Sequence, residues 1–295
     1  MKTKRIAVFS AVVLMLGLLA GCSFRIDSDT LLHIKQNFRY ASYEHADEYT
    51  AGDYTYSAAD AKEIRINWVG GSVDVVQSDS AELTVSENSI DLSDDAQCHS
   101  LLKDGILTVH FCASDFSGEI DSSQKSLTVE IPAGAVLVVD TVSADAVAEE
   151  LSAADFAFNS VSGNMTVGRL TSDAVEVNTV SGGFSADEVS ANTFSFGSVS
   201  GGITAHALSV DQFISDTTSG DVELEIVSCR EADIDTISGR TVLTLPADGA
   251  TVRYQTSSGV LKSQREYRQE GFFYGFGPAE SKISVNSVSG DLKIE

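Results

Sequence analysis

Basic side chains are scarce in this sequence. Lysine and arginine together number 19, against 43 aspartate and glutamate residues, so the formal net charge is −24. Nucleic acids and anionic lipids are bound mainly through positive charge. The composition therefore excludes nucleic acid as a partner and argues against direct docking on anionic lipid. An acidic surface is typical of exported proteins, where it confers solubility. Weak binding of divalent cations is the alternative use of such a surface.

The motifs of common catalytic sites are also missing. There is no Gly-x-Ser-x-Gly nucleophile turn, no P-loop and no Gly-x-Gly-x-x-Gly between a strand and a helix. The five histidines are scattered, and neither an EF-hand loop nor a Gly-Gly-x-Gly-x-Asp calcium repeat occurs. We therefore expect no enzymatic activity, no cofactor and no metal. A polysaccharide-active enzyme is the less favoured alternative, because the alternating acids Asp221, Glu223 and Glu225 fit the solvent face of a strand better than a catalytic groove.

What the sequence does contain is a repeat with a period of 19 residues. Serines recur at positions 143, 162, 181, 200, 219 and 238, and glycine follows all but the first. Apolar residues form columns between these serines, and columns two residues apart are typical of strands with one buried face. The repeat predicts two short strands per coil, with Ser-Gly at the corner because glycine accepts positive φ and takes little room. One such column holds Phe156, Val175, Phe194, Phe213 and Ala232.

A fixed period of this length is typical of a solenoid. One 19-residue coil cannot bury its apolar side alone, whereas stacked coils pack like against like. Six coils at the strand spacing of ~4.8 Å would form a rod about 30 Å long. An ordinary β-sandwich with accidental spacing is the alternative. We predict an all-β protein: a β-solenoid (β-helix-like) with 19-residue coils over residues 136–295, with a loop insertion at about 262–281.

The first 21 residues resemble a bacterial lipoprotein signal peptide. Three basic residues precede an apolar stretch, residues 6–20, that is too short for a comfortable membrane span. It ends in Leu19-Ala20-Gly21-Cys22, and the resemblance implies that Cys22 is lipidated and becomes the first residue. A plain signal peptide or an uncleaved anchor is the alternative. We expect a lipid-anchored protein on the extracytoplasmic side of a bacterial cell membrane. Cleavage would leave 16 basic and 43 acidic side chains, a net charge of −27.

Two segments separate the signal from the solenoid. Residues 22–62 are polar with scattered aromatics and predict a tether and lead-in. Residues 63–135 contain alternating apolar runs separated by Gly70-Gly71 and by Lys103-Asp104-Gly105, which predicts a block of β-hairpins. Val69-Gly70-Gly71 looks like a degenerate copy of the corner motif. We therefore expect this N-terminal hairpin block to cap the solenoid.

Cys98 and Cys112 lie on the two arms of the hairpin predicted at Asp104-Gly105, and three interpretations stay open. A disulfide suits an exported protein. However, a two-residue turn would pair residue 98 with residue 111, so Cys112 is offset by one and a bulge would be needed. Two buried or free thiols are the second interpretation. A zinc or copper site that includes His110 is the third, although its spacing follows no known pattern.

The insertion at about 262–281 is the candidate contact site. Insertions in solenoids project as loops, often on the binding face. Aromatic rings beside basic groups on a glycine-containing loop suit a sugar ring or a protein partner. The alternative is that the aromatics fold over the last coil and seal the core. The candidate residues are Lys262, Arg265, Tyr267, Arg268, Phe272, Phe273, Tyr274 and Phe276.

The order of these segments resembles the DUF4097 family of β-strand-repeat proteins, which is linked by name to adhesins. The residues that carry the resemblance are 64–73, the strand 127–132, the Val-Ser-Gly coils and the closing Val-Ser-Gly-Asp-Leu-Lys-Ile at 288–294. It covers the chain from about residue 50 to the end and implies a membrane-tethered solenoid with no reaction to transfer. We expect a binding, adhesion or scaffolding module whose partner is a cell-wall glycan or an envelope protein. The alternative is an envelope-stress or regulatory accessory protein that acts through a membrane partner.

Overall fold

Each central repeat forms one long strand that bends from one face of the molecule to the other. The computed structural model describes residues 40–89, 91–278 and 281–295; the predicted signal peptide, Cys22 and the first part of the tether lie outside these residues. In the central coils the two short strands expected for each coil are merged into one continuous strand. The parallel register joins residues 19 apart, as in Met165 with Phe184. These strands are β12 (Met165–Thr179), β13 (Phe184–Ser198), β14 (Ile203–Thr217) and β15 (Val222–Thr236).

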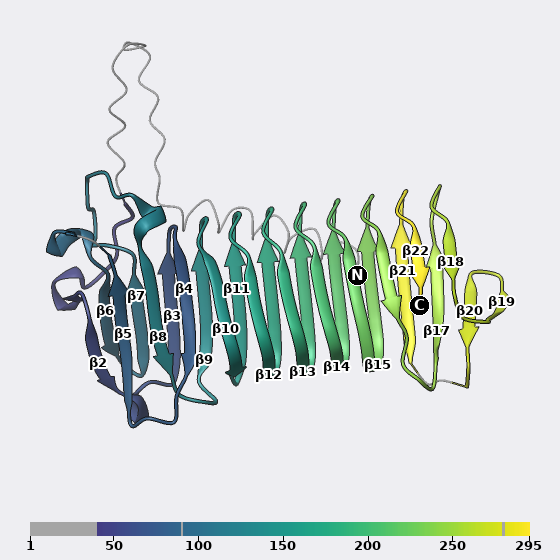
Figure 1. Cartoon of the computed structure of the whole chain (residues 1–295), viewed down its shortest axis with the longest axis horizontal. Coiled ribbons are helices and arrows are strands. Elements are labelled where there is room, and N and C mark those ends of the chain that lie inside the picture. Colours follow the sequence, from purple (N-terminus) through teal and green to yellow (C-terminus); the bar gives the residue numbers. More distant parts are fainter. Residues whose placement is uncertain (1–39, 90, 279–280) are drawn as a thin grey trace, which may run out of the picture.

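Two layers of strands run the length of the molecule, and Figure 1 shows them as a long rod. Face A contains the first halves of β12 to β15, and face B contains their second halves. In spatial order, face A also holds β2 (Tyr54–Ser57), β5 (Glu82–Asn88), β8 (Ser126–Ile131), β4 (Ser72–Gln77) and β10 (Asp145–Ser152) before β12, and β16 (Thr241–Thr244), β22 (Leu292–Ile294) and β18 (Leu261–Ser263) after β15.

Face B is built in the same way. The all-β prediction is confirmed, and helical structure in the described residues is limited to short 3-10 turns at Ala46–Glu48, Ala58–Asp60, Asp94–Ala96 and Ser122–Gln124. In spatial order, face B holds β1 (Thr50–Ala51), β6 (His99–Lys103), β7 (Ile106–His110), β3 (Glu63–Trp68), β9 (Val136–Thr141) and β11 (Asp155–Ser160) before β12, and β21 (Lys282–Ser287), β17 (Ala250–Gln255), β20 (Phe273–Phe276) and β19 (Arg268–Glu270) after β15.

The N-terminal hairpin block continues both faces of the rod. β3 pairs in parallel with β9, and β4 pairs in parallel with β10. At the corner between β3 and β4, the carbonyl of Val69 accepts a hydrogen bond from the amide of Ser143 at 2.8 Å. Antiparallel strands then close each face. Residues 40–62, expected as the end of the tether and lead-in, join this block. β1 and β2 pair with β6 and β5, and the Tyr43 ring stacks on His110 with centroids 3.9 Å apart.

The last segment of the chain does not lie at the far end of the rod. β21 lies between β15 and β17, and β22 lies between β16 and β18, so the C-terminal coil is inserted between two earlier ones. The terminal edges are instead β18 and the β19–β20 hairpin. The sequence could not give this order, because identical corner motifs stack equally well in any order.

The corner glycines are required by close approach of the backbone and not by positive φ. A Cβ on Gly182 would lie 1.9 Å from the carbonyl oxygen of Gly163, and one on Gly201 would lie 1.8 Å from that of Gly182. Neither glycine has a positive φ. The amide of each glycine donates to the hydroxyl three residues earlier: Gly182 to Thr179 at 2.8 Å and Gly201 to Ser198 at 2.7 Å. The corner motif is therefore Ser/Thr-x-Ser-Gly, which begins one residue before the Val-Ser-Gly of the repeat.

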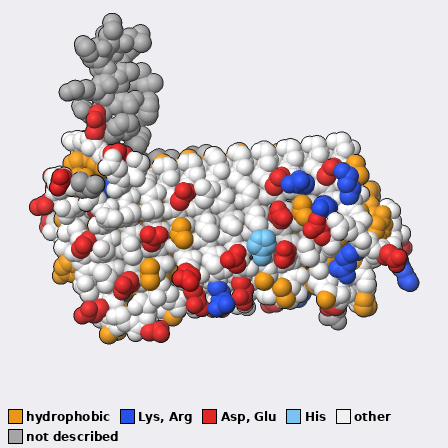
Figure 2. Space-filling view, in the orientation of Figure 1, with side chains coloured by type: hydrophobic (Ala, Val, Ile, Leu, Met, Phe, Trp, Pro, Cys, Tyr) orange, Lys and Arg blue, Asp and Glu red, His pale blue; other side chains and the backbone are white. Residues whose placement is uncertain are grey.

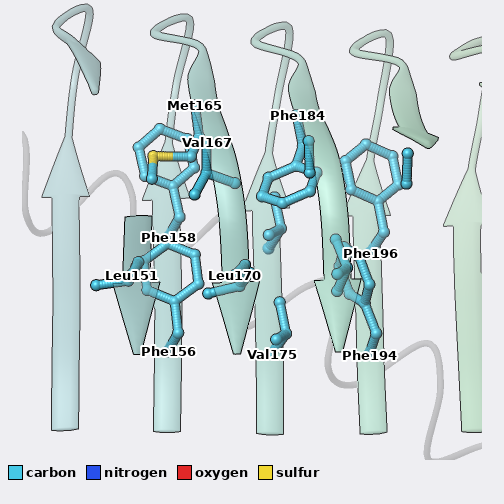
Figure 3. Close-up of a cluster of buried hydrophobic side chains, with 14 of the residues drawn as sticks. Leu151, Phe156, Phe158, Met165, Val167, Leu170, Val175, Phe184, Phe194 and Phe196 are labelled. Atoms are coloured by element: carbon cyan, nitrogen blue, oxygen red, sulfur yellow. The ribbon is translucent and has the colours of Figure 1, made fainter. Parts of the chain in front are cut away.

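The core is the narrow space between the two faces. Figure 3 shows Phe156, Phe158, Met165, Leu170 and Phe194 pointing into it from successive coils. These side chains are at most 1% exposed. Rings in the Phe column contact each other edge to face, and the Phe194 centroid lies 5.4 Å from that of Phe213. The apolar columns predicted from the repeat thus form the core, and each coil is stabilised by its two neighbours.

Candidate binding surface

The predicted contact loop is a β-hairpin whose aromatic residues divide into two groups. Phe272 is 60% exposed, Phe273 50% and Tyr267 44%. Phe276 is fully buried, and Tyr274 is half-buried with its hydroxyl accepting a hydrogen bond from the Gln269 side chain. Both interpretations of this loop, as a contact site and as a seal over the core, hold for part of it. One end of the hairpin closes the core, and its tip presents aromatic rings to solvent.

The basic residues predicted for the same loop also have different surroundings. Arg265 donates to the carbonyls of Leu245 and Pro246, at 3.3 and 3.1 Å, and so ties the chain to the preceding coil. Lys262 projects from face A, where its ammonium lies 3.7 Å from the Asp291 carboxylate. Arg268 is exposed on the hairpin strand β19.

A groove lies beside the hairpin on the outer surface of face B. It has a volume of about 840 Å³ and lies over β15, β21 and β17. Strand register places Asp233, Ser284, Arg253 and Phe273 in one row across the sheet. Residues lining the groove are Arg230, Glu231, Asp233, Arg253, Phe273 and Lys282, together with smaller side chains.

Arg253 is fixed in this groove by neutral partners. Its guanidinium donates to the Ser284 hydroxyl at 3.5 Å, to the Asn286 side chain at 3.3 Å and to the Gln255 side chain. Among the described residues no carboxylate lies within ion-pair distance of it. The guanidinium therefore has a defined position while its charge is not neutralised by a direct partner.

The cysteine pair at the other end of the molecule is not bridged. Cys98 and Cys112 are buried free thiols, and burial raises the pKa of each to about 12. The register explains why: β6 and β7 pair His99 with His110, so Cys112 is one position out of line, as the two-residue turn implies. Of the three interpretations left open by the sequence, the structure has the one with two buried thiols. No group of three or more His, Cys, Asp or Glu side chains in the described part of the chain could hold a metal ion.

The N-terminal hairpin block contains a buried ion pair that the sequence did not indicate. The Lys125 ammonium lies 3.0 Å from the Glu87 carboxylate, and both side chains are at most 2% exposed. It also donates to the carbonyls of Ala96 and Phe111 and lies 4.0 Å from the centre of the Phe111 ring. Desolvation lowers the pKa of Lys125, and Glu87 opposes this effect. The pair is completely enclosed, so its role is structural.

Comparison with known proteins now identifies the fold. The family described as Toastrack DUF4097 matches residues 61–295. The chain belongs to the Toastrack DUF4097 family. The resemblance inferred from the repeat is thereby confirmed. No curated protein matches the chain.

Two solved structures share the Toastrack architecture. A protein of Bacteroides fragilis, described as a candidate adhesin, is 15% identical, with 82% of this chain and 96% of that chain covered and a TM-score of 0.54. A protein of Parabacteroides distasonis, described as a candidate lipid-binding protein, is 17% identical, with 83% and 97% covered and a TM-score of 0.55. At these identities the likeness gives the fold alone. No described helix of this Toastrack chain is long and apolar enough to cross a membrane.

Sequence reasoning missed the groove residues that lie outside the predicted loop. Arg230, Arg253 and Lys282 come from three separate strands and share a surface only because β21 is inserted between β15 and β17. One signal was available: Arg253 stands between the apolar Val252 and Tyr254, which marks it as outward-facing. Which strands would lie beside it could not be inferred.

Proposed function

We propose that this Toastrack chain is a lipid-anchored binding or adhesion module at the extracytoplasmic side of a bacterial cell envelope, and that its contact site is the tip of the β19–β20 hairpin. The observation that carries the proposal is the exposure of Phe272 and Phe273 at the tip of a hairpin whose other end is held by the buried Phe276. Exposed aromatic side chains on a fixed element are typical of contact sites for sugars and proteins.

The family and the neighbouring structures support a binding role in general. Family and neighbours are described by fold, adhesion or lipid binding, and none by a reaction. We therefore propose a non-enzymatic protein whose partner is a cell-wall glycan or an envelope protein. Anchoring is proposed from the signal-like segment that ends at Cys22.

Co-sedimentation with purified cell-wall material tests the binding site. The full-length chain carrying Cys22→Ser would be compared with the same chain that also carries Phe272→Ala and Phe273→Ala. Tyr54→Ala is the matched control, because Tyr54 is 44% exposed at the opposite end of the rod. We expect sedimentation to be lost in the double variant only. Absence of binding by every form would reject the proposal and favour a regulatory role through a membrane partner.

Membrane fractionation tests the anchor separately. Replacing the Cys22 thiol removes the only atom that the lipid could modify in the predicted motif. Cys22→Ser should move the protein from the membrane fraction to the soluble fraction, whereas Cys229→Ser, at a buried thiol, should not. Continued membrane association of Cys22→Ser would contradict the lipoprotein interpretation.

A further inference from the structure

Unpaired basic side chains gather at one place on this acidic protein. In the described part of the chain most lysines and arginines lie within ion-pair distance of a carboxylate: Arg65, Lys103, Lys125, Arg169, Arg240, Lys262 and Lys293. Besides Lys62 and Arg265, the basic residues without such a described partner are Arg230, Arg253, Arg268 and Lys282, all at the C-terminal end of face B.

This distribution does not follow from composition. Acidic side chains outnumber basic ones, 43 to 19, so carboxylate partners are abundant over the molecule as a whole. In Figure 2, which shows one face of the rod, lysines and arginines gather towards the C-terminal end, and acidic side chains are spread over the whole face, that end included. A cation without a fixed partner in such a protein provides attraction for an anion that comes from outside.

The groove also contains groups that suit sugar hydroxyls. Glu231 and Asp233 line it beside the cations, and a carboxylate accepts several hydrogen bonds. These carboxylates repel any anionic ligand, but the hydroxyls of an acidic polysaccharide can donate hydrogen bonds to them, whereas the side-chain carboxylates of an acidic peptide cannot. Phe273, half exposed at the groove, offers a flat apolar surface on which a sugar ring can pack.

We propose that the groove binds an acidic polysaccharide. A sugar ring packs on Phe273, and the carboxylate or phosphate of the sugar accepts hydrogen bonds from Arg253, which its neutral partners hold in place. Lys282 and Arg230 attract the charges of adjoining sugars, and Glu231 accepts hydrogen bonds from hydroxyls. This inference rests on the proposed function, since it names the ligand class of a groove that shares Phe273 with the proposed contact site.

Two matched pairs of polymers test the proposal. Polygalacturonate would be compared with its fully methyl-esterified form, which keeps the backbone and loses the charge, and phosphomannan with mannan. Binding by the full-length chain with Cys22→Ser would be measured by affinity electrophoresis. We expect retention by polygalacturonate, phosphomannan or both, with at least about tenfold weaker retention by the uncharged partner, because charge-assisted hydrogen bonds to arginine are among the strongest in proteins.

Variants locate the binding in the groove. Arg253→Gln and, separately, Lys282→Gln should weaken retention by the acidic polymer, the former by about tenfold. Arg240→Gln is the control, because Arg240 is on face A and lies 3.7 Å from Asp221. Phe273→Ala should also weaken retention. If Arg253→Gln lowers the melting temperature, Lys282→Gln, at an exposed side chain, decides the matter.

The outcomes separate the two levels of inference. Equal retention by the charged and uncharged forms would overturn the acidic ligand, and so would equal retention by polyglutamate or by phosphatidylglycerol vesicles. If the groove variants are retained as strongly as the chain with the natural groove residues, the groove is not the binding site. In each case binding to cell-wall material would still support the proposed function. Failure of the chain to bind any envelope material would reject both.

Discussion

At the scale of single residues, backbone packing at the corners restricts the sequence most strongly. Successive coils approach so closely at the Ser-Gly corners that a methyl group has no space. At Gly182, Gly201 and Gly239 the hydroxyl three residues earlier accepts a hydrogen bond from the glycine amide. In the sequence this restriction is visible as the recurrence of Ser-Gly every 19 residues. The physical reason became visible only when the carbonyl of the preceding coil was in place.

Adjacent glycines provide a direct test of this restriction. Gly182→Ala would put a Cβ 1.9 Å from the Gly163 oxygen, whereas the nearest atom to a Cβ on Gly183 lies 3.3 Å away. We expect Gly182→Ala to lower the free energy of unfolding by at least about 2 kcal/mol and Gly183→Ala by less than about 1 kcal/mol. Chemical denaturation measures both. Similar losses in the two variants would contradict the steric explanation.

A half-buried histidine in the N-terminal hairpin block makes stability depend on pH. Burial, with a smaller contribution from His99, lowers the pKa of His110 from 6.5 to about 4. Below about pH 6.5 the unfolded chain binds a proton that the folded chain refuses, so stability falls as the pH drops towards 4, by up to about 3 kcal/mol.

His110→Phe tests this effect and keeps a ring against Tyr43. Denaturation midpoints between pH 4 and 7 should change less steeply with pH in the variant than in the natural chain. Val227→Phe adds a ring at a 60% exposed position without removing a titratable group, so it serves as the control and should leave the slope unchanged. An unaltered slope in His110→Phe would show that other groups cause the acid sensitivity.

At the scale of structural elements, the order of the coils at the C-terminal end departs from the order of the sequence. β17 and β18 are synthesised before β21 and β22, yet the later strands separate them from the rest of the rod. The 19-residue register predicted the coils themselves. It could not predict an insertion, because each corner motif is compatible with either neighbour.

Removal of residues 282–295 should therefore affect strands that precede the deletion. We expect β17 to lose hydrogen-exchange protection, because it keeps only its antiparallel partner β20, and β18 to lose its partner β22. Val288→Ser, at an exposed corner, is the control and should preserve protection. Full protection of β17 in the truncated chain would contradict the insertion.

At the scale of the whole molecule, one continuous core joins the hairpin block to the last coil. Each coil depends on its two neighbours, so damage in the middle of the rod affects both halves. Phe194 contacts Phe184 and Phe213 with ring centroids 5.3 and 5.4 Å away.

Phe194→Asp should consequently abolish cooperative thermal unfolding, because the substitution places a carboxylate in the core without a partner. Phe272→Asp changes the same residue type at a 60% exposed position and should melt like the natural chain. Circular dichroism records both curves. A cooperative transition of normal midpoint in Phe194→Asp would show that the column is not structural.

The sequence by itself determined the fold class, the stacked coils, the apolar columns and the family, because each is a local pattern that repeats and is stabilised by its own copies. The sequence also located the hairpin at Asp104-Gly105 and the mismatch of Cys98 with Cys112, since the register of a short hairpin follows from its turn. Only the tertiary structure decided which coils are neighbours, which hairpin aromatics are buried, and that Arg230, Arg253 and Lys282 share a groove. These depend on contacts between distant segments, and repeated coils of nearly equal shape leave no trace of their spatial order in the chain.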